Sequence, residues 1–258
     1  DKIDKRIVED YLFWMESTRK NSASTRNQRL SALKSLFQYI RSESVIYTAL
    51  CCDILSVPEK KTPTVPPQYL SLKEMEVLFS MPDARTKHGR RDLTILLVLY
   101  DTAARVSELI ELRVADISVG KTMTVKLFGK GNKTRIIPIT QKTSDILQGY
   151  MNENHITKME QLLFENRSHG KLTTAGISYI LKKYVSMGKQ VNSNMFNLNI
   201  SPHLLRSTKA SHLIQAGANI YYIRDFLGHK SVLTTERYAR NNPEVVRNAI
   251  TKASSDLT

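Results

Sequence analysis

The chain has 258 residues, of which 41% are hydrophobic, so it is long and apolar enough for one large or two ordinary folded domains and too apolar to be disordered. Lysine and arginine total 38 against 24 acidic residues, for a formal net charge of +14, which favours a polyanion such as nucleic acid as partner; a basic surface that binds nothing is the alternative. No run of about 18 apolar residues occurs, which excludes a membrane-spanning helix.

Two helical patterns open the chain. The first carries a single apolar stripe, made of Ile3, Ile7, Val8, Tyr11, Leu12 and Met15. In the second, Thr25 and Gln28 have the spacing of a capping box, which predicts Thr25 as the N-cap. Arg26, Arg29 and Lys34 follow on the polar surface of that helix. They are candidate contacts with a nucleic-acid backbone, although ordinary helix solubility explains them equally well.

The two cysteines, Cys51 and Cys52, are adjacent in the sequence. Neighbouring residues rarely form a relaxed disulfide, and no metal-ligand spacing accompanies them. We therefore expect reduced, structural thiols in a cytoplasmic protein.

Residues 58–69 are predicted to be a linker because prolines at this density cannot continue a helix; they are Pro58, Pro63, Pro66 and Pro67. The linker separates a helical domain of residues 1–57 from a larger domain of residues 70–258. Since helical pattern begins almost at the first residue, we expect the first domain to lack an upstream part. Ser71 and Glu74 form another capping box, so a helix starts directly after the linker.

The larger domain is predicted to be mainly helical with a small β-hairpin or three-stranded edge sheet, an α+β arrangement. Residues 123–127 alternate between apolar and polar, and residues 134–139 form a second β-rich run in which Pro138 suggests an edge strand. Lys130 lies in the turn between these strands. Helices are predicted near 72–80, 91–101, 105–112, 143–152, 174–186, 203–216, 219–227, 232–239 and 243–253.

Two arginines have a polar partner one helical turn away. A carboxylate at the spacing of Glu108 can fix the guanidinium of Arg105, and guanidiniums bind two phosphate oxygens at once; a surface ion pair is the simpler interpretation. His203 and Arg206 project from the first turn of a helix begun by Pro202, where backbone N–H groups favour anions. A half-buried histidine beside a solvated arginine explains that pair as well.

Lys130, His229 and Tyr238 carry weak signals when each is taken alone. A lysine between two glycines is usually a solvated hairpin residue, and most of the 11 tyrosines are expected to be packing residues. Taken with the arginines, these side chains supply what phosphoryl transfer requires. Arg105, Arg206 and His229 can neutralise the phosphate, and Tyr238 can act as nucleophile. Lys130 and His203 can serve as acid and base. We see no carboxylate cluster suited to two metal ions.

With these motifs in order, the chain resembles the tyrosine recombinases, the phage integrase family of Xer-like and lambda-integrase-like enzymes. The resemblance rests on five segments: SASTRNQRLSALKSLFQYIRSE, TAARVSELIELRVADI, FGKGNKTRIIPI, SPHLLRSTKASHLIQAGANIYYIRDFLGH and SVLTTERYAR. It implies a two-domain DNA clamp that pairs a core-binding domain with a DNA breaking-rejoining catalytic domain. It also implies double-stranded DNA as substrate and a homo-tetramer acting on two DNA sites.

The resemblance implies roles for the site residues. Tyr238 would form a 3′-phosphotyrosyl link, Lys130 would protonate the leaving oxygen, and His203 would manage the tyrosine proton. Arg105, Arg206 and His229 would hold the phosphate, and Glu108 would support Arg105. Rejoining would need no metal, ATP or other cofactor, and no small molecule would be a substrate. Residues 243–258 would pack on a neighbouring protomer. Integration or excision of a mobile element is the preferred role, ahead of chromosome-dimer resolution or DNA inversion.

The chain departs from the family pattern at Ser207, where many relatives carry a histidine, and at Lys209, where an apolar residue is common. Lys209 is therefore a candidate DNA contact, together with Lys133 and Arg135. A type IB topoisomerase is the nearest rival enzyme because it uses the same chemistry. A catalytically silent DNA-binding protein of the same fold is the rival from another class.

Overall fold

A computed structural model describes the chain apart from residues 1–2, 64–66, 130–132, 167, 169 and 240–258, and apart from the side chains of residues 237 and 239. The chain divides into two compact units, Asp1–Val65 and Pro66–Thr258. Each unit has its own hydrophobic cluster. Among the described residues, no helix is both long and apolar enough to cross a membrane.

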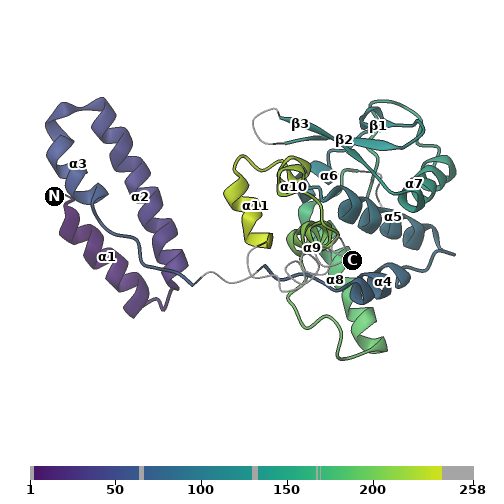
Figure 1. Cartoon of the computed structure of the whole chain (residues 1–258), viewed down its shortest axis with the longest axis horizontal. Helices are drawn as coiled ribbons and strands as arrows, with labels where there is room; N and C mark the ends of the chain where they lie inside the picture. The colour runs from purple at the N-terminus through teal and green to yellow at the C-terminus, as the bar shows by residue number, and fades with distance from the viewer. Residues whose placement is uncertain (1–2, 64–66, 130–132, 167, 169, 240–258) are drawn as a thin grey trace, which may run out of the picture. The chain divides into compact units, whose positions relative to one another are not determined.

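The first unit contains the helices α1 (Lys5–Ser17), α2 (Ala23–Glu43) and α3 (Thr48–Leu55), with the 3-10 turn η1 (Val45–Tyr47) between the last two (Figure 1). Its core is built from Val8 and Leu12 of α1, Leu30 and Phe37 of α2, and Ile54 of α3. The helix α3 is absent from the sequence prediction. It has only eight residues, so its apolar pattern is too short to reveal a period.

The start of α2 corrects a second prediction. The N-cap is Ser22, whose hydroxyl accepts a hydrogen bond from the Thr25 backbone N–H at 3.2 Å. The helix therefore begins one turn before the predicted capping box, because Ser22 offers the same capping oxygen earlier in the chain. Thr25 lies inside the helix, and Arg26 lies on its buried side.

The second unit begins with α4 (Leu72–Ser80), and the capping box predicted between Ser71 and Glu74 is present. The other helices are α5 (Lys87–Thr102), α6 (Val106–Leu109), α7 (Gln141–Glu153), α8 (Thr174–Val191), α9 (Pro202–Gln215), α10 (Ile220–Leu227) and α11 (Val232–Ala239), with a 3-10 turn η2 (Val114–Asp116). The helix predicted over 105–112 is a single turn, α6, for which Arg105 is the N-cap residue. The helix predicted over 243–253 lies outside the described residues.

The sheet has three antiparallel strands in the order β1 (Ile117–Ser118), β2 (Thr124–Phe128) and β3 (Thr134–Pro138). In the register between β2 and β3, Val125 faces Ile137 and both side chains are buried. Pro138 ends the edge strand β3, as predicted. Lys130, predicted at the tip of the turn, lies outside the described residues. The observed fold, mainly α with a small edge sheet, confirms the predicted fold class.

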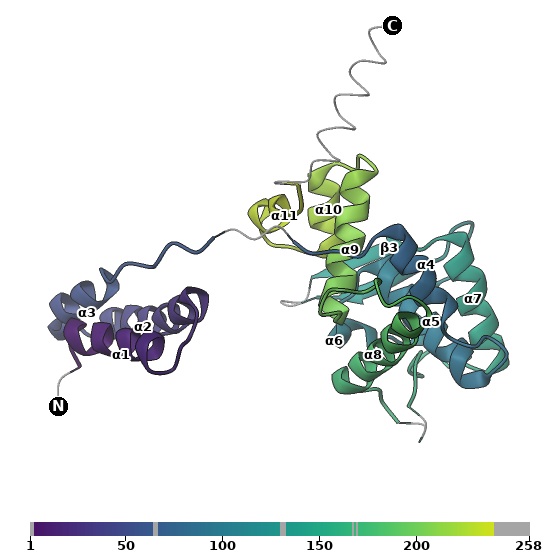
Figure 2. The same cartoon turned by 90° about the horizontal axis from the view of Figure 1, so that it is seen from below.

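Helix α5 lies at the centre of the second unit. Ile95, Leu96 and Leu99 on this helix are fully buried, and both α7 and α9 pack against it. The helices α9, α10 and α11 form one group beside α5 (Figures 1 and 2), and α10 also contacts strand β3 of the sheet. This packing brings the end of α5, the start of α6 and the end of α10 to the first turns of α9.

Candidate active site

Arg105 owes its position to an unusual end of helix α5. Ala103, the C-cap residue, adopts the left-handed conformation with φ 46° and ψ 35°, which is uncommon for a residue with a side chain. The chain thereby reverses direction, and Arg105 becomes the N-cap residue of α6. Its backbone N–H donates to Glu108 Oε2 at 2.7 Å and its Nη1 donates to Oε1 at 2.9 Å. The predicted pairing is therefore present, and it fixes both the backbone and the side chain of Arg105.

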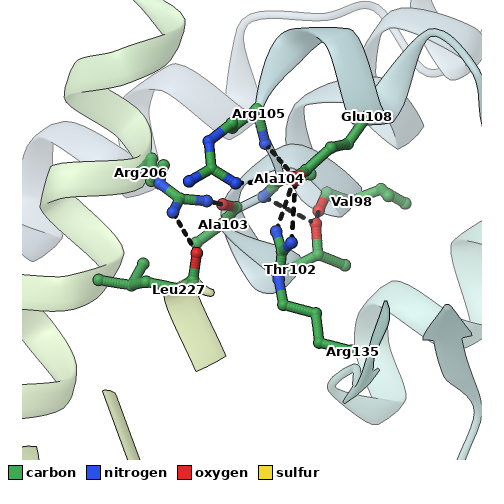
Figure 3. A network of polar contacts seen from close by, with 9 residues as sticks. All are labelled: Val98, Thr102, Ala103, Ala104, Arg105, Glu108, Arg135, Arg206 and Leu227. Carbon is green, nitrogen blue, oxygen red and sulfur yellow. Dashed lines mark hydrogen bonds and ion pairs between the residues drawn. The ribbon is translucent and has the colours of Figure 1, made fainter. Parts of the chain in front are cut away.

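Glu108 also binds a second arginine, Arg135 of strand β3 (Figure 3). The Nη1 of Arg135 donates to Oε1 at 2.9 Å and its Nη2 donates to Oε2 at 2.7 Å. The Glu108 side chain is only 4% exposed. Burial by itself would raise the pKa of Glu108, but the hydrogen bonds from Arg135 and Arg105 outweigh it and hold that pKa below its ordinary value. The carboxylate is therefore ionised at neutral pH.

Arg206 is the deepest cation of the site, with 3% of the residue exposed. Its Nη1 donates to the Ala103 carbonyl at 2.6 Å, and its Nη2 donates to the Leu227 carbonyl. It thus joins the end of α5 to the end of α10 (Figure 3). Burial, followed by the charges of Arg105 and Arg135, lowers the pKa of Arg206 to about 10. The guanidinium still carries its charge at neutral pH.

His229 follows Gly228, which ends α10 in the left-handed conformation with φ 64° and ψ 41°, where glycine is favoured. The Nδ1 of His229 lies 3.0 Å from the hydroxyl of Thr235 in α11. Burial, followed by the charges of Arg206 and Arg105, lowers the pKa of His229 to about 4. The imidazole is therefore neutral at pH 7 in the absence of DNA, and its role in neutralising the phosphate stays a prediction.

Tyr238 lies in α11 and is 4% exposed. It belongs to an apolar cluster with Ala103, Ile214 and Leu227. The Oη of Tyr238 is 3.5 Å from the Oγ of Ser207, the residue next to Arg206. The phenol is thus held mainly by apolar packing, close to the backbone groups that Arg206 binds.

His203 is exposed in the first turn of α9, and its charge contributes to lowering the pKa of His229. Gly129, the last described residue before Lys130, lies beside the arginine network. A Cβ at Gly129 would lie 3.7 Å from Glu108 Oε1. A cavity of about 650 Å³ opens beside these residues and is lined by Arg105, Lys133, Arg135, His229 and Lys230, among others. The described part of the site is therefore strongly cationic.

The structure separates the candidate DNA contacts into exposed and enclosed groups. Arg29 and Lys133 are exposed, and Lys34 is half-buried. Arg26 is only 7% exposed and donates to the Pro58 carbonyl at 3.1 Å, so it ties α2 to the chain that follows α3. Lys209 lies 3.1 Å from the buried carboxylate of Asp101. For both enclosed residues this geometry favours a role in the fold over a DNA contact.

Two features of the site gave no signal in the sequence. Thr235 sits in a pair of threonines, and only the fold shows which of them reaches His229. The bond between Arg135 and Glu108 joins residues 27 positions apart, beyond any local spacing rule. Among the described residues, no three histidine, cysteine, aspartate or glutamate side chains are grouped so that they could hold a metal ion.

Comparisons with known proteins bear on the whole chain. The model of the phage integrase family matches residues 68–244. A putative integrase/recombinase of Sinorhizobium fredii is 30% identical, over 98% of this chain and 76% of its own length. The tyrosine recombinase XerC of Bacillus subtilis is 32% identical, over 92% of this chain and 77% of its own length. The XerH site-specific recombinase bound to palindromic difH substrate, a post-cleavage complex, has the same fold with a TM-score of 0.73 at 20% identity, over 97% of this chain and 72% of that one.

Proposed function

The chain belongs to the phage integrase family, the tyrosine-type site-specific DNA recombinases, and from this premise we propose that it cleaves and rejoins DNA through Tyr238. The observation that carries the proposal is the convergence of distant segments. Arg206 binds the carbonyls that flank the Arg105 turn and the His229 turn. Ser207, beside it, lies 3.5 Å from the phenol of Tyr238. Cations and a nucleophile are thereby gathered in one place.

In the proposed reaction, Arg105 and Arg206 bind the non-bridging oxygens of the scissile phosphate, where negative charge develops. His229 adds a hydrogen bond, and the negative charge of the bound phosphate favours its protonated form. The Tyr238 oxygen attacks phosphorus as the bond from phosphorus to the 5′ oxygen breaks. The phenolic proton passes to His203, and the 5′ oxygen receives a proton from Lys130. The new phosphotyrosyl ester retains the energy of the old one, so rejoining needs no ATP.

The enclosure of Arg206 adds a condition to this reaction. Arg206 is 3% exposed, and Tyr238 packs against Ala103, whose carbonyl Arg206 binds. A phosphate therefore reaches Arg206 only after α11 shifts. We assign that shift to DNA binding, when the phosphate replaces the apolar contacts of Tyr238 near the guanidinium.

The partners follow from the same proposal. Double-stranded DNA is the substrate, a proposal supported by the XerH complex with its difH substrate and by the lambda integrase dimer bound to a core site. We further propose, from the family resemblance, that four protomers act on two sites. Residues 1–57 grip the DNA as a core-binding domain, with Arg29 and Lys34 as phosphate contacts. We place the protein in the cytoplasm, in keeping with its reduced Cys51 and Cys52. Mobile-element integration or excision is the preferred role, and chromosome-dimer resolution or inversion is the alternative.

A nicked suicide substrate tests the nucleophile. Wild type should give a DNA-linked protein band on a denaturing gel, and Tyr238→Phe should give none. Tyr222→Phe is the matched control, because Tyr222 is 78% exposed on α10 and its variant should keep the band. A band that survives Tyr238→Phe would show that another residue is the nucleophile. Sequencing the trapped DNA would then identify the target site.

Two further assays separate the rivals. A topoisomerase would relax a supercoiled plasmid without exchanging strands between paired sites. A recombinase would exchange strands between the two sites. A silent DNA-binding protein would shift DNA in a gel yet leave no covalent band. Because side-chain cations serve the phosphate, the band should also persist in EDTA, and strict dependence on Mg²⁺ would contradict the proposed mechanism.

A further inference from the structure

We propose that Arg135 is a positioning residue of the cleavage site. It holds the Glu108 carboxylate so that most N–H groups of the Arg105 guanidinium stay available for the DNA phosphate. This inference rests on the proposed function. It also replaces the expectation from sequence that Arg135 itself contacts DNA.

The guanidinium fork of Arg135 is directed at Glu108. Both of its terminal nitrogens bind Glu108, one to each carboxylate oxygen, at 2.9 and 2.7 Å. The side chain is 9% exposed, and its Nε is buried without a partner among the described residues. A guanidinium in this position cannot turn a fork toward a phosphate without abandoning Glu108.

The acceptors of Glu108 are equally engaged. The Oε1 atom receives one hydrogen bond from Arg105 and one from Arg135, and Oε2 receives the Arg105 backbone N–H and the second bond from Arg135. A carboxylate offers about four acceptor positions, so all of them are filled. Arg105 consequently gives only Nη1 to Glu108, while its side chain stays 40% exposed.

Arg135 therefore determines which guanidinium nitrogens of Arg105 are available to the DNA phosphate. Without Arg135, two acceptor positions of Glu108 would open, and Arg105 could close a two-pronged fork on the same carboxylate. That fork would occupy the nitrogens that the phosphate needs. Arg135 thus competes with Arg105 for Glu108 and thereby keeps the Arg105 guanidinium available to a phosphate. Figure 3 draws the contacts of both arginines with Glu108.

Arg135 also reaches the turn that carries His229. A Cβ built on Gly228 would lie 3.4 Å from Arg135 Nη1 and 3.5 Å from its Cδ, so the guanidinium packs directly against that glycine. One side chain of β3 thus touches the start of α6 and the end of α10. A change at Arg135 is expected to misplace groups in both segments, and displacements on the order of 1 Å can cost about 100-fold in rate.

Arg135→Gln, assayed by single-turnover cleavage of the suicide substrate, tests the inference. We expect the cleavage rate to fall about 10- to 100-fold, with DNA affinity within about twofold of wild type because most affinity comes from other phosphate contacts. Arg135→Lys should restore part of the rate, since it keeps the charge without the fork. Arg113→Gln is the matched control, because Arg113 also pairs with a glutamate, Glu160, at 3.4 Å, and its rate should not change.

The pH profile distinguishes positioning from a purely structural role. The groups that face Glu108 are Arg105 from its own turn and Arg135 from β3, with the charge of Arg206 nearby. Removal of Arg135 takes away a hydrogen-bonded cation and leaves a buried carboxylate, so the pKa of Glu108 should rise. Cleavage by Arg135→Gln should then fall further as pH increases, because the ionised Glu108 carboxylate captures the fork of Arg105. The double variant with Glu108→Gln should lose this pH dependence and should be no slower than the product of the two single effects predicts.

Three outcomes would overturn the inference. Wild-type cleavage by Arg135→Gln would show that Glu108 needs no second partner. Weaker DNA binding, with a salt dependence reduced by about one charge, would make Arg135 a phosphate contact. A slow variant with an unaltered pH profile would leave Arg135 as part of the fold only. If wild type itself forms no covalent band, the proposed function fails instead, and a double-variant cycle on the free energy of unfolding still measures the coupling of Arg135 to Glu108.

Discussion

The two sides of the site are held by different forces. The guanidinium side consists of Arg105, Glu108, Arg135 and Arg206. Its arginine side chains donate hydrogen bonds of 2.6 to 2.9 Å to the Glu108 carboxylate and to the Ala103 carbonyl. The phenol side, made of Ser207, His229, Thr235 and Tyr238, has hydroxyl contacts of 3.0 and 3.5 Å between neutral groups, set in apolar packing.

This difference indicates which half of the site is ready before DNA arrives. Charged hydrogen bonds are roughly twice as strong as neutral ones and fix orientation when they are bidentate. A contact of 3.5 Å is at the limit of a hydrogen bond and orients a phenol weakly. The guanidinium side is therefore preformed for a phosphate, whereas the phenol side is free to be realigned by the substrate.

The largest effect should come from Arg105→Ala on the guanidinium side. Loss of one preorganised donor to developing charge typically costs about 10²- to 10³-fold in rate, while DNA affinity should be largely retained. Single-turnover cleavage and a gel-shift titration measure the two quantities. Arg85→Ala is the control, since the Arg85 side chain is 91% exposed. A variant that binds DNA poorly but cleaves at the wild-type rate once bound would reverse the assignment of Arg105.

A smaller effect should come from Thr235→Val on the phenol side. The change removes the hydroxyl that orients His229 and keeps the shape of the side chain. A neutral hydrogen bond contributes about 1 kcal/mol, which corresponds to roughly a fivefold loss of cleavage rate. Thr94→Val is the control, because Thr94 of α5 is equally buried and its variant loses a bond to the Arg90 carbonyl. A loss as large as that of Arg105→Ala would show that the two sides are equally preorganised.

The sequence predicted best what depends on near neighbours. The capping box of Ser71 and Glu74 and the pairing of Arg105 with Glu108 both join residues three positions apart, where helix geometry alone decides the contact. The same rule was wrong for Thr25, because Ser22 satisfies the helix start one turn earlier. Spacing identifies a possible cap but does not choose between two of them.

Contacts between distant segments could not be read from spacing. The Arg206 side chain binds a carbonyl 103 residues away, and Arg135 of β3 binds Glu108 of α6, so their roles depend on packing. The charge of His229 is another such property, since burial and the arginines lower its pKa. The resemblance to a family could name the site residues, whereas the enclosure of Arg26 and Lys209 required the fold.

A pH-dependent effect on stability tests whether the folded site keeps His229 neutral. His229 has a pKa of about 4 in the folded chain and an ordinary value of 6.5. Between these two pH values, His229 is protonated in the unfolded chain and neutral in the folded chain. The contribution of His229 to the free energy of unfolding must therefore fall as pH falls through this window and stay constant above it. His229→Gln cannot titrate. The difference in unfolding free energy between wild type and His229→Gln should therefore be constant above about pH 7 and shift against wild type as pH falls toward 4.

Urea denaturation of both proteins from pH 7.5 down to about 4.5 measures this difference, and the comparison removes the titration of all other groups that the two chains share. Lys230→Gln provides a control, because it changes the adjacent side chain and keeps His229. A difference that does not change with pH would mean that His229 protonates equally well in the folded chain. Burial and the nearby arginines would then fail to keep the imidazole neutral before DNA binds.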